Sequence, residues 1–254
     1  MTSSPKLLIS ATVLTKNSSR KLSATLKSLE DFAEVIVLDS GSSDNTEEIA
    51  KSFSNVKYYQ SEFLGFGPMK QKASSYASHD WIMSVDSDEV LSAELLGALK
   101  GLNLGANSVY SFTRRNHYRG KWIKGCDWYP DSVIRLYNKK ITNFSEAKLH
   151  EKILLNSSTK LIRLSYPIFH YPYDSVAELI KKLDHYSSIY AEDHKGRRIS
   201  VVGIVFRTLY SFFRNYFLKL GVFQGRAGLL ISFCSAAGVF YKYFKLLEIN
   251  DDAL

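Results

Sequence analysis

The sequence predicts an α/β fold, in which a mostly parallel sheet carries helices on both faces and a C-terminal helical appendage follows. In the first hundred residues, β-rich apolar runs alternate with segments whose apolar residues recur at helical spacing. The strand-like runs are apolar almost throughout, as is typical of parallel strands buried on both faces. From Asp174 onward the pattern is purely helical.

Four strands and three helices are expected in this first part of the chain. The strands are LLISATVLT (7–15), EVIVLDS (34–40), VKYYQ (56–60) and WIMSV (81–85). The helices are the Leu22–Leu29 segment, SSDNTEEIAKSF (42–53) and PMKQKASSYA (68–77). The second helix opens on N-cap residues and early carboxylates, and the third has Pro68 in its first turn. Residues 105–165 show no clean alternation, and we expect short strands there that complete a cleft.

Composition and charge bound the class of protein. The chain has 254 residues, of which 45% are hydrophobic and 23% charged, so a disordered protein is excluded. Its two cysteines are far apart and are expected to be reduced, which fits the cytosol, and we expect no signal peptide. Residues 1–100 hold 10 basic and 13 acidic residues, whereas the remainder holds 23 and 12. This asymmetry predicts a C-terminal part that meets an anionic partner.

Polar and acidic residues stand where three of the predicted strands end. Thr15 and Asn17 follow the first strand, Asp39 follows the second, and the sequence DSDE follows the fourth. Ligands of open parallel sheets bind at the carboxyl ends of the strands. The sequence therefore predicts a site at this edge.

The stretch VDSDE brings Asp86, Asp88 and Glu89 within four positions, where like charges repel unless a cation compensates them. Mg²⁺ or Mn²⁺ takes oxygen ligands and is typically held by one or two carboxylates and a substrate's phosphates. Strand alternation predicts that Asp86 and Asp88 point to the same side. The divalent metal would then neutralise charge on a departing nucleoside diphosphate.

Several segments resemble a known family. ISATVLTKN, VIVLDSGSSDNTEEIA and DWIMSVDSDE are similar to the nucleotide-sugar-binding half of family 2 inverting glycosyltransferases, which have the GT-A fold, a Rossmann-like α/β fold. FLGFGPMKQKASSYASHDW, RRNHYRGKWIKGCDWYPDSVIRLY, KLHEKI and FQGRAGLL resemble the small lipopolysaccharide-core β-glucosyltransferases that act on inner-core heptose. The resemblance implies a glycosyltransferase domain over 1–172, with nucleotide-sugar binding in 1–100 and the acceptor side in 101–172. From its excess of basic residues, and not from the resemblance, we expect the region 173–254 to be basic, helical and membrane-associating.

The resemblance also implies roles for matching positions. Asp88 would bind the metal, and His150 would reach the diphosphate or the metal. The expected nucleotide-sugar contacts are Thr15, Asn17, Asp39, Lys70, Gln71, Asp86 and Arg135. Asp44 is either a second contact or a cap of the following helix, and Arg135 either contacts diphosphate or pairs with a core carboxylate.

An inverting transfer needs a base that deprotonates the acceptor hydroxyl. The sequence offers Glu151, in LHEK, and Asp131, in WYPD, and Glu151 is favoured. Trp128 and Tyr129 precede Asp131 and are expected to stack on an acceptor sugar, unless they are core aromatics.

The C-terminal segment from Lys195 to Lys245 has nine basic residues and no acidic one. Its longest uncharged run, 227–241, is shorter than the roughly 20 residues of a spanning helix. Basic amphipathic helices lie in the membrane interface and prefer anionic lipid. We therefore expect peripheral attachment to the cytoplasmic face of the inner membrane rather than a nucleic-acid partner. The alternative is a helical layer packed on the main domain, and a homo-oligomer remains open.

The sequence as a whole predicts a metal-dependent transferase that moves a hexose, with UDP-glucose as the expected donor, onto a lipopolysaccharide-core acceptor. Another lipid-linked or polysaccharide acceptor is the first alternative. A nucleotidyltransferase would need a glycine-rich phosphate loop after the first strand, where this chain has TKNSSRK. A non-enzymatic membrane- or nucleic-acid-binding module would leave the acidic strand ends without a purpose.

Overall fold

The computed structural model describes residues 6–147 and 151–251. The chain forms two compact units. The first comprises the residues up to Arg114 together with Asp131–His170, and the second comprises Arg115–Pro130 and the chain from Tyr171 onward. The second break lies close to the predicted boundary after residue 172. The sequence did not indicate that 115–130 groups with the helices.

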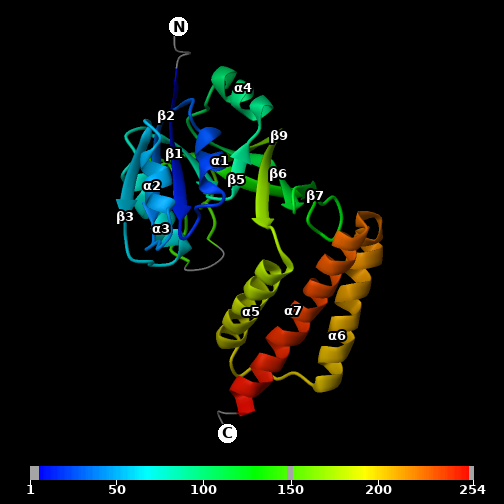
Figure 1. Cartoon of the computed structure of the whole chain (residues 1–254). Coiled ribbons are helices and arrows are strands. Elements are labelled where there is room, and N and C mark those ends of the chain that lie inside the picture. Colours follow the sequence, from blue (N-terminus) through cyan, green and yellow to red (C-terminus); the bar gives the residue numbers. More distant parts are fainter. Residues whose placement is uncertain (1–5, 148–150, 252–254) are drawn as a thin grey trace. The chain divides into compact units, whose positions relative to one another are not determined.

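The described residues form nine strands in one sheet, and the helices lie in both units (Figure 1). The strands are β1 (Leu7–Thr15), β2 (Phe32–Asp39), β3 (Val56–Gln60), β4 (Trp81–Asp86), β5 (Glu89–Leu91), β6 (Ser108–Tyr118), β7 (Lys121–Trp122), β8 (Asp131–Asn138) and β9 (Lys160–Tyr173). The α-helices are α1 (Leu22–Lys27), α2 (Thr46–Lys51), α3 (Phe66–Ser75), α4 (Ala93–Gly101), α5 (Val176–Asp193), α6 (Val201–Phe213) and α7 (Arg226–Asp251). A π-helical turn, η1 (Arg214–Leu218), and a 3₁₀ turn, η2 (Gly221–Gln224), join α6 to α7.

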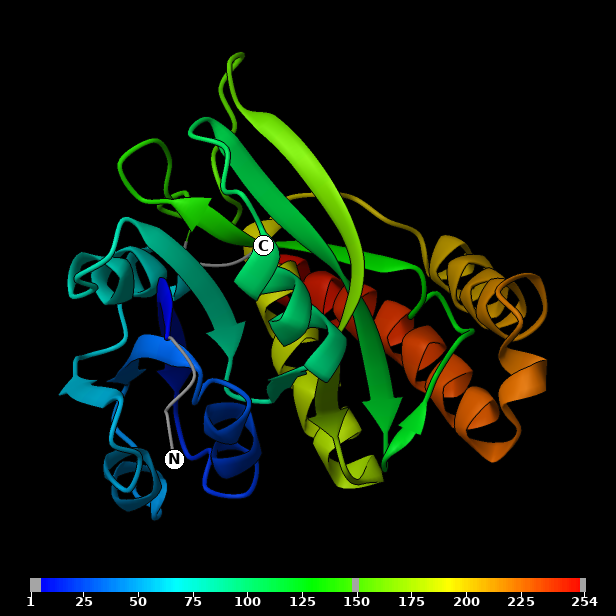
Figure 2. The same ribbon diagram turned by 90° about the horizontal axis from the view of Figure 1, so that it is seen from above.

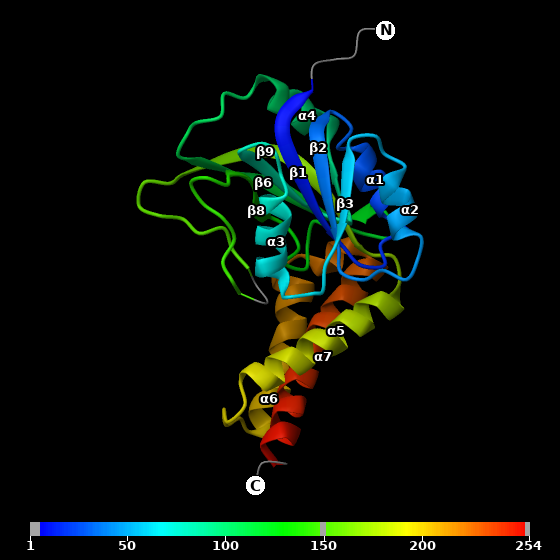
Figure 3. The same cartoon turned by 90° about the vertical axis from the view of Figure 1, so that its left-hand side faces the viewer.

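The α/β prediction is confirmed, but the sheet is mixed rather than mostly parallel. Its strand order is β3-β2-β1-β4-β8-β6-β9-β5, with β7 paired to β6. Strands β3, β2, β1 and β4 are parallel, whereas β8 pairs antiparallel with both β4 and β6, and β5 pairs antiparallel with β9. Figure 3 shows α1 and α2 on one face of β1–β3 and α3 on the other. Buried apolar side chains form the main hydrophobic core of this unit.

The register of the parallel strands aligns their carboxyl ends. Thr15 at the end of β1 lies opposite Asp39 at the end of β2, and Leu14 lies opposite Asp86 at the end of β4. The predicted gathering of polar strand ends at one edge is therefore confirmed.

The middle of the chain differs from its prediction. The region contains one short strand, the two-residue β7, but also two long ones, because β6 has 11 residues and β9 has 14. The alternation was hidden because β6 begins with five buried residues, while long stretches of β9 are half-exposed or exposed. Strand β8 pairs with the first half of β4, at Trp81–Met83, and Arg135 of β8 reaches Asp86 and Glu89 of the DSDE segment.

In the second unit, α7 lies between α5 and α6 (Figure 1). Side chains from all three helices, including Ala191, Ile204 and Leu246, bury a common core. By length and composition alone α7 could cross a membrane, and 28% of its most apolar stretch is buried. This differs from the expectation from the longest uncharged run, which is shorter because single charges interrupt the apolar sequence.

Candidate active site

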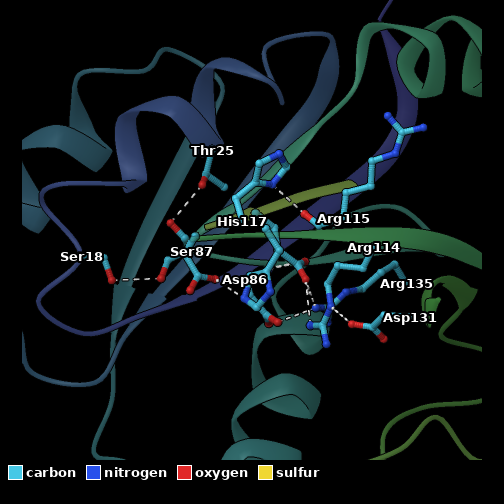
Figure 4. Close-up of polar contacts among 12 residues, drawn as sticks. Ser18, Thr25, Asp86, Ser87, Arg114, Arg115, His117, Asp131 and Arg135 are labelled. Atoms are coloured by element: carbon cyan, nitrogen blue, oxygen red, sulfur yellow. Dashed lines mark hydrogen bonds and ion pairs between the residues drawn. The ribbon is translucent and has the colours of Figure 1, made fainter. Parts of the chain in front are cut away.

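An alternating network of charges occupies the carboxyl-terminal edge of β4 in the first unit. The ion pairs run in the order Glu151, Lys70, Asp86, Arg135, Glu89, Arg114 and Asp131. Figure 4 shows Arg135 beside Asp86, and Arg114 beside Asp131. Carboxylates from DSDE and from two later segments are thus joined through three cations.

Asp86 closes β4 and has two cationic partners. Its Oδ1 lies 3.0 Å from Lys70 Nζ, and its Oδ2 accepts a hydrogen bond from Arg135. Burial alone would raise the pKa of Asp86, but Arg135 and Lys70 outweigh it and hold that pKa well below its usual value. Arg135 is only 5% exposed, and this burial would lower its pKa, but the carboxylates of Asp86 and Glu89 outweigh it and raise that pKa. Of the two roles left open for Arg135, pairing with a core carboxylate is the one that the structure contains.

Glu89 is the acidic residue of DSDE for which no role was predicted. It is fully buried and accepts hydrogen bonds from Arg135, from Arg114 at 3.3 Å and from the Asp86 backbone N–H at 3.1 Å. A buried carboxylate is stable only when it is paired and hydrogen-bonded in this way. Glu89 therefore fixes the turn between β4 and β5 and orients both arginines.

Asp88 has a different partner from Asp86. Ser87 and Asp88 form a turn rather than continuing the strand, so the prediction from strand alternation that Asp86 and Asp88 share a side does not apply. His170 lies on β9, directly opposite Glu89 of β5. Its Nε2 is 3.4 Å from Asp88 Oδ1. Burial would raise the pKa of Asp88, but the hydrogen bond and charge of His170 lower it overall. The two side chains supply an oxygen and a nitrogen donor next to each other.

The two candidate bases lie at opposite ends of the network. Glu151 is 3.4 Å from Lys70 and about one-sixth exposed, at 17%. Asp131 accepts a hydrogen bond from Arg114 Nε at 2.8 Å. Both carboxylates therefore belong to the network, Glu151 next to Lys70 and Asp131 next to Arg114.

The loops after β1 and β2 hold each other in place. Asn17 has a positive φ of 50°, and its side-chain carbonyl accepts from the Ser43 backbone N–H at 2.8 Å. Asp39 is fully buried and accepts from Ser42 and from the Tyr58 hydroxyl at 2.7 Å. The pKa of Tyr58 is raised to about 12, chiefly because the hydroxyl is buried and also because it lies beside the Asp39 carboxylate.

Two further strand-end residues complete this edge. Asp44, which precedes the N-cap residue Asn45, accepts from the backbone N–H and hydroxyl of Thr46 in α2 and from the Ser19 backbone N–H, so it ties the two loops to the start of the helix. These bonds, chiefly that from the Thr46 hydroxyl, lower the pKa of Asp44 to about 2. Thr15 Oγ1 is buried and has no hydrogen-bond partner within the described residues. An unpaired buried hydroxyl is a ready contact for a ligand.

Helix α3 carries Lys70 and Gln71 and is pinned against the segment before Glu151. Gln71 Nε2 donates to the Phe144 backbone carbonyl at 2.6 Å, and Lys70 Nζ lies 5.0 Å from the centre of the Phe144 ring. Gly67 permits this approach, because a Cβ there would overlap the Ser145 carbonyl. Gln71 is thus engaged by the protein, whereas Lys70 stays within reach of both Asp86 and Glu151.

The remaining predicted residues lie elsewhere. Trp128 and Tyr129 belong to the second unit, where Trp128 packs with Tyr173 and Tyr129 contacts the Trp122 ring edge-on. Trp128 is half-buried, whereas Tyr129 remains 39% exposed. His150 lies outside the described residues.

Sequence reasoning missed Arg114, Glu89 and His170. Arg114 stood in an arginine pair, RR, with nothing to single it out, and His170 stood in the aromatic stretch FHYPY. Only the antiparallel pairing of β5 with β9 brings His170 to Asp88, and no local pattern encodes that pairing.

The glycosyl transferase family 2 model matches residues 10–150, which is more than half of the chain. The chain is a family 2 glycosyltransferase. Its relatives include an uncharacterised glycosyltransferase of Rickettsia typhi, 28% identical over 95% of this chain and 87% of the relative. The lipopolysaccharide core biosynthesis glycosyltransferase LpsC of Rhizobium meliloti is 24% identical over 98% of each chain.

The solved structures agree with a GT-A fold. The mannosyltransferase PcManGT of Pyrobaculum calidifontis, solved with GDP-mannose and Mn²⁺, has a TM-score of 0.53 and is 12% identical, over 96% of this chain and 89% of that one. This family 2 glycosyltransferase is therefore an enzyme, which decides against the nucleotidyltransferase and non-enzymatic alternatives.

Proposed function

We propose that the strand-end network binds a UDP-sugar with a divalent metal and transfers its hexose, with inversion, to a lipopolysaccharide-core acceptor. The Asp88–His170 pair next to the Asp86 network is the observation that carries the proposal. The name of the LpsC relative supports the acceptor class, and the resemblance of the motifs supports UDP-glucose as donor. Within this proposal the enzyme works at the cytoplasmic face of the inner membrane.

The side chains around Asp88 show whether a metal ion could bind there. Asp86 is already compensated by Lys70 and Arg135, whereas Asp88 lies beside the His170 imidazole and is within the influence of the Lys21 charge. No cluster of three or more potential ligands occurs in those residues, so a metal would need a substrate's phosphates to complete its shell. Mg²⁺ and Mn²⁺ commonly bind in this manner, so the residues fit. Asp88 and His170 would hold the ion, which would neutralise charge on the leaving diphosphate.

The protein's own residues would serve the donor in distinct ways. The Lys70 ammonium, buried beside Asp86, is available to a diphosphate oxygen. Thr15 Oγ1 is available to the nucleotide, and the Asp39 carboxylate orders the loop that would contact the uracil. Asn17 would shape the same loop from the β1 side.

Transfer forms a bond from the acceptor oxygen to the anomeric carbon and breaks the bond from that carbon to the phosphate oxygen. The acceptor proton would pass to the carboxylate of Glu151. We favour Glu151 over Asp131 because Asp131 is held by a charged hydrogen bond of 2.8 Å, whereas Glu151 is 3.4 Å from its cation. A weakly held carboxylate is more easily freed to accept a proton.

A thermal-shift screen of UDP-, GDP- and CMP-sugars with Mn²⁺ tests the donor class. Ligand binding stabilises the folded state by mass action, so UDP-sugars should raise the melting temperature more than the other nucleotides do. A larger shift with GDP- or CMP-sugars would refute the donor assignment.

A further inference from the structure

Helix α6 presents an apolar face to solvent. The exposed fractions of its members run from 45% to 70%, and the residues are Val202, Val205, Phe206, Leu209 and Phe213. Their spacing places them on one side of the helix. Ile204, on the other side, is buried in the core shared with α5 and α7. We call these five exposed residues the α6 face.

The apolar surface continues beyond α6. Figure 2 shows the turn that joins α6 to α7 at one end of the pair, drawn in orange. In this turn Leu218, Leu220 and Phe223 are 58%, 55% and 77% exposed. On α7, Phe233 is 60% exposed and its ring lies 4.9 Å from that of Phe212. Contiguous exposed apolar surface of this kind marks an interaction site.

Unpaired cations flank this surface. Lys195, Arg197 and Arg198 are exposed just before α6, Arg207 is exposed on α6, and Arg226 is exposed at the start of α7. None of the five has an acidic partner in the described part of the chain. Other basic residues between Lys195 and Lys245 do form ion pairs. Arg214 and Lys219 pair with Asp127, and Lys245 pairs with Asp184.

We propose that the α6 face and the Leu218–Phe223 turn insert into the interface of an anionic lipid bilayer, with the flanking cations on lipid headgroups. The 13 residues of α6 span about 20 Å, so the helix can lie in the membrane plane between basic groups at its two ends. The inference rests on the proposed function in one respect: a lipid-linked acceptor explains why the enzyme would bind a membrane.

Charge complementarity selects this occupant. A second copy of the chain, meeting the same surface by two-fold symmetry, would bring like cations together. An anionic bilayer offers both apolar depth and negative headgroups. Crossing of the bilayer by α7 is disfavoured because α7 is the middle helix, whose Tyr243 and Leu246 are buried against its neighbours.

Vesicle flotation of the full chain tests the docking surface. The vesicles are phosphatidylcholine alone or mixed with an equal amount of phosphatidylglycerol, at low and at high ionic strength. The wild type should bind the mixed vesicles and lose binding at high salt. The variant Phe206→Ser/Leu209→Ser/Phe213→Ser should bind about 100-fold more weakly or worse. Substituting Lys195, Arg197 and Arg198 by Gln should weaken binding to the mixed vesicles about 10- to 100-fold.

The control variant Val176→Ser/Ile180→Ser alters exposed apolar residues on α5 and should float like the wild type. Equal flotation with both vesicles, no flotation, or unaltered flotation of the α6 variant would overturn the proposal. So would a wild-type dimer that the α6 variant makes monomeric, or wild-type protein that resists an alkaline wash, as a spanning helix would. Calorimetric measurement of UDP affinity on the same proteins tests the nucleotide-sugar site separately from the membrane-docking surface. Flotation without UDP binding refutes only the donor site, and UDP binding without flotation refutes only the docking surface.

Discussion

At the scale of single residues, Asp88 and His170 form the pair on which the proposed metal site rests. We predict that Asp88→Ala and His170→Ala each weaken Mn²⁺ binding in the presence of UDP at least about tenfold, because each removes one of two protein ligands. Isothermal calorimetry measures the affinity. Asp80→Ala, which removes a half-exposed carboxylate paired to Lys140, is the matched control. Unaltered Mn²⁺ affinity in both site variants would show that the metal, if bound, lies elsewhere.

A second residue-scale prediction concerns the base. Glu151→Gln keeps the shape of the side chain and removes its basicity, so turnover should fall about 10²–10⁴-fold while UDP affinity is retained. Asp131→Asn is the matched comparison, since Asp131 lies at the other end of the same network. Were Asp131→Asn alone to show this loss, the role of base would pass to Asp131.

Single residues also show what the sequence could and could not reveal. Asp39, Asp86 and Asp88 could be predicted because parallel strands end at a common edge. Lys70 and Arg135 were also expected at the site, but their pairing with Asp86 itself could not be predicted, because they meet Asp86 only after α3 and β8 pack beside β4. The sequence attributed that compensation to a metal, and the structure supplies most of it with side chains.

At the scale of elements, Glu89 links β4, β5, β6 and β8 through its two arginines and the Asp86 backbone. Glu89→Gln would remove the negative partner that the buried Arg135 shares with the partly exposed Arg114. Breaking a buried pair in this way should lower the free energy of unfolding by about 3–5 kcal/mol. Urea denaturation measures the change, with the exposed Glu62→Gln as control. A loss no larger than that of the control would mean that the arginines are satisfied without Glu89.

Glu34 has a comparable role at the other end of the parallel strands. From β2 it accepts from Ser10 on β1 at 2.5 Å and from Lys57 on β3 at 2.6 Å. Burial would raise the pKa of Glu34, but Lys57 and the serine hydroxyls outweigh it and lower that pKa from 4.5 to about 2. The folded-state pKa lies below the unfolded one, so Glu34 stabilises the fold above pH 4.5 and this stability is lost as the pH falls toward 2.

We therefore predict that Glu34→Gln lowers the free energy of unfolding at neutral pH by up to about 3 kcal/mol. The difference from the wild type should shrink between pH 4.5 and 2, because the wild-type carboxylate is then protonated as well. Urea denaturation across this pH range measures it, with the exposed Glu48→Gln as control. A difference that does not depend on pH would contradict the assignment of the effect to ionisation.

At the scale of the whole molecule, the chain forms two compact units whose course along the sequence could not be predicted. The change from strand to helical patterning near residue 172 marks one break closely. The grouping of 115–130 with the helices depends on contacts such as that of the Cys126 backbone N–H with the Lys219 carbonyl at 2.7 Å. Contacts between segments about 90 residues apart leave no periodic signal, so this grouping required the structure.

Release of UDP from UDP-glucose, in the presence of lipopolysaccharide-core acceptor and with or without Mn²⁺, tests the central claim most directly. The wild type should release UDP only when metal and acceptor are both present. Asp88→Ala should release none above background and keep the thermal stability of its fold. Full turnover without a divalent metal, or turnover by Asp88→Ala equal to that of the wild type, would contradict the account.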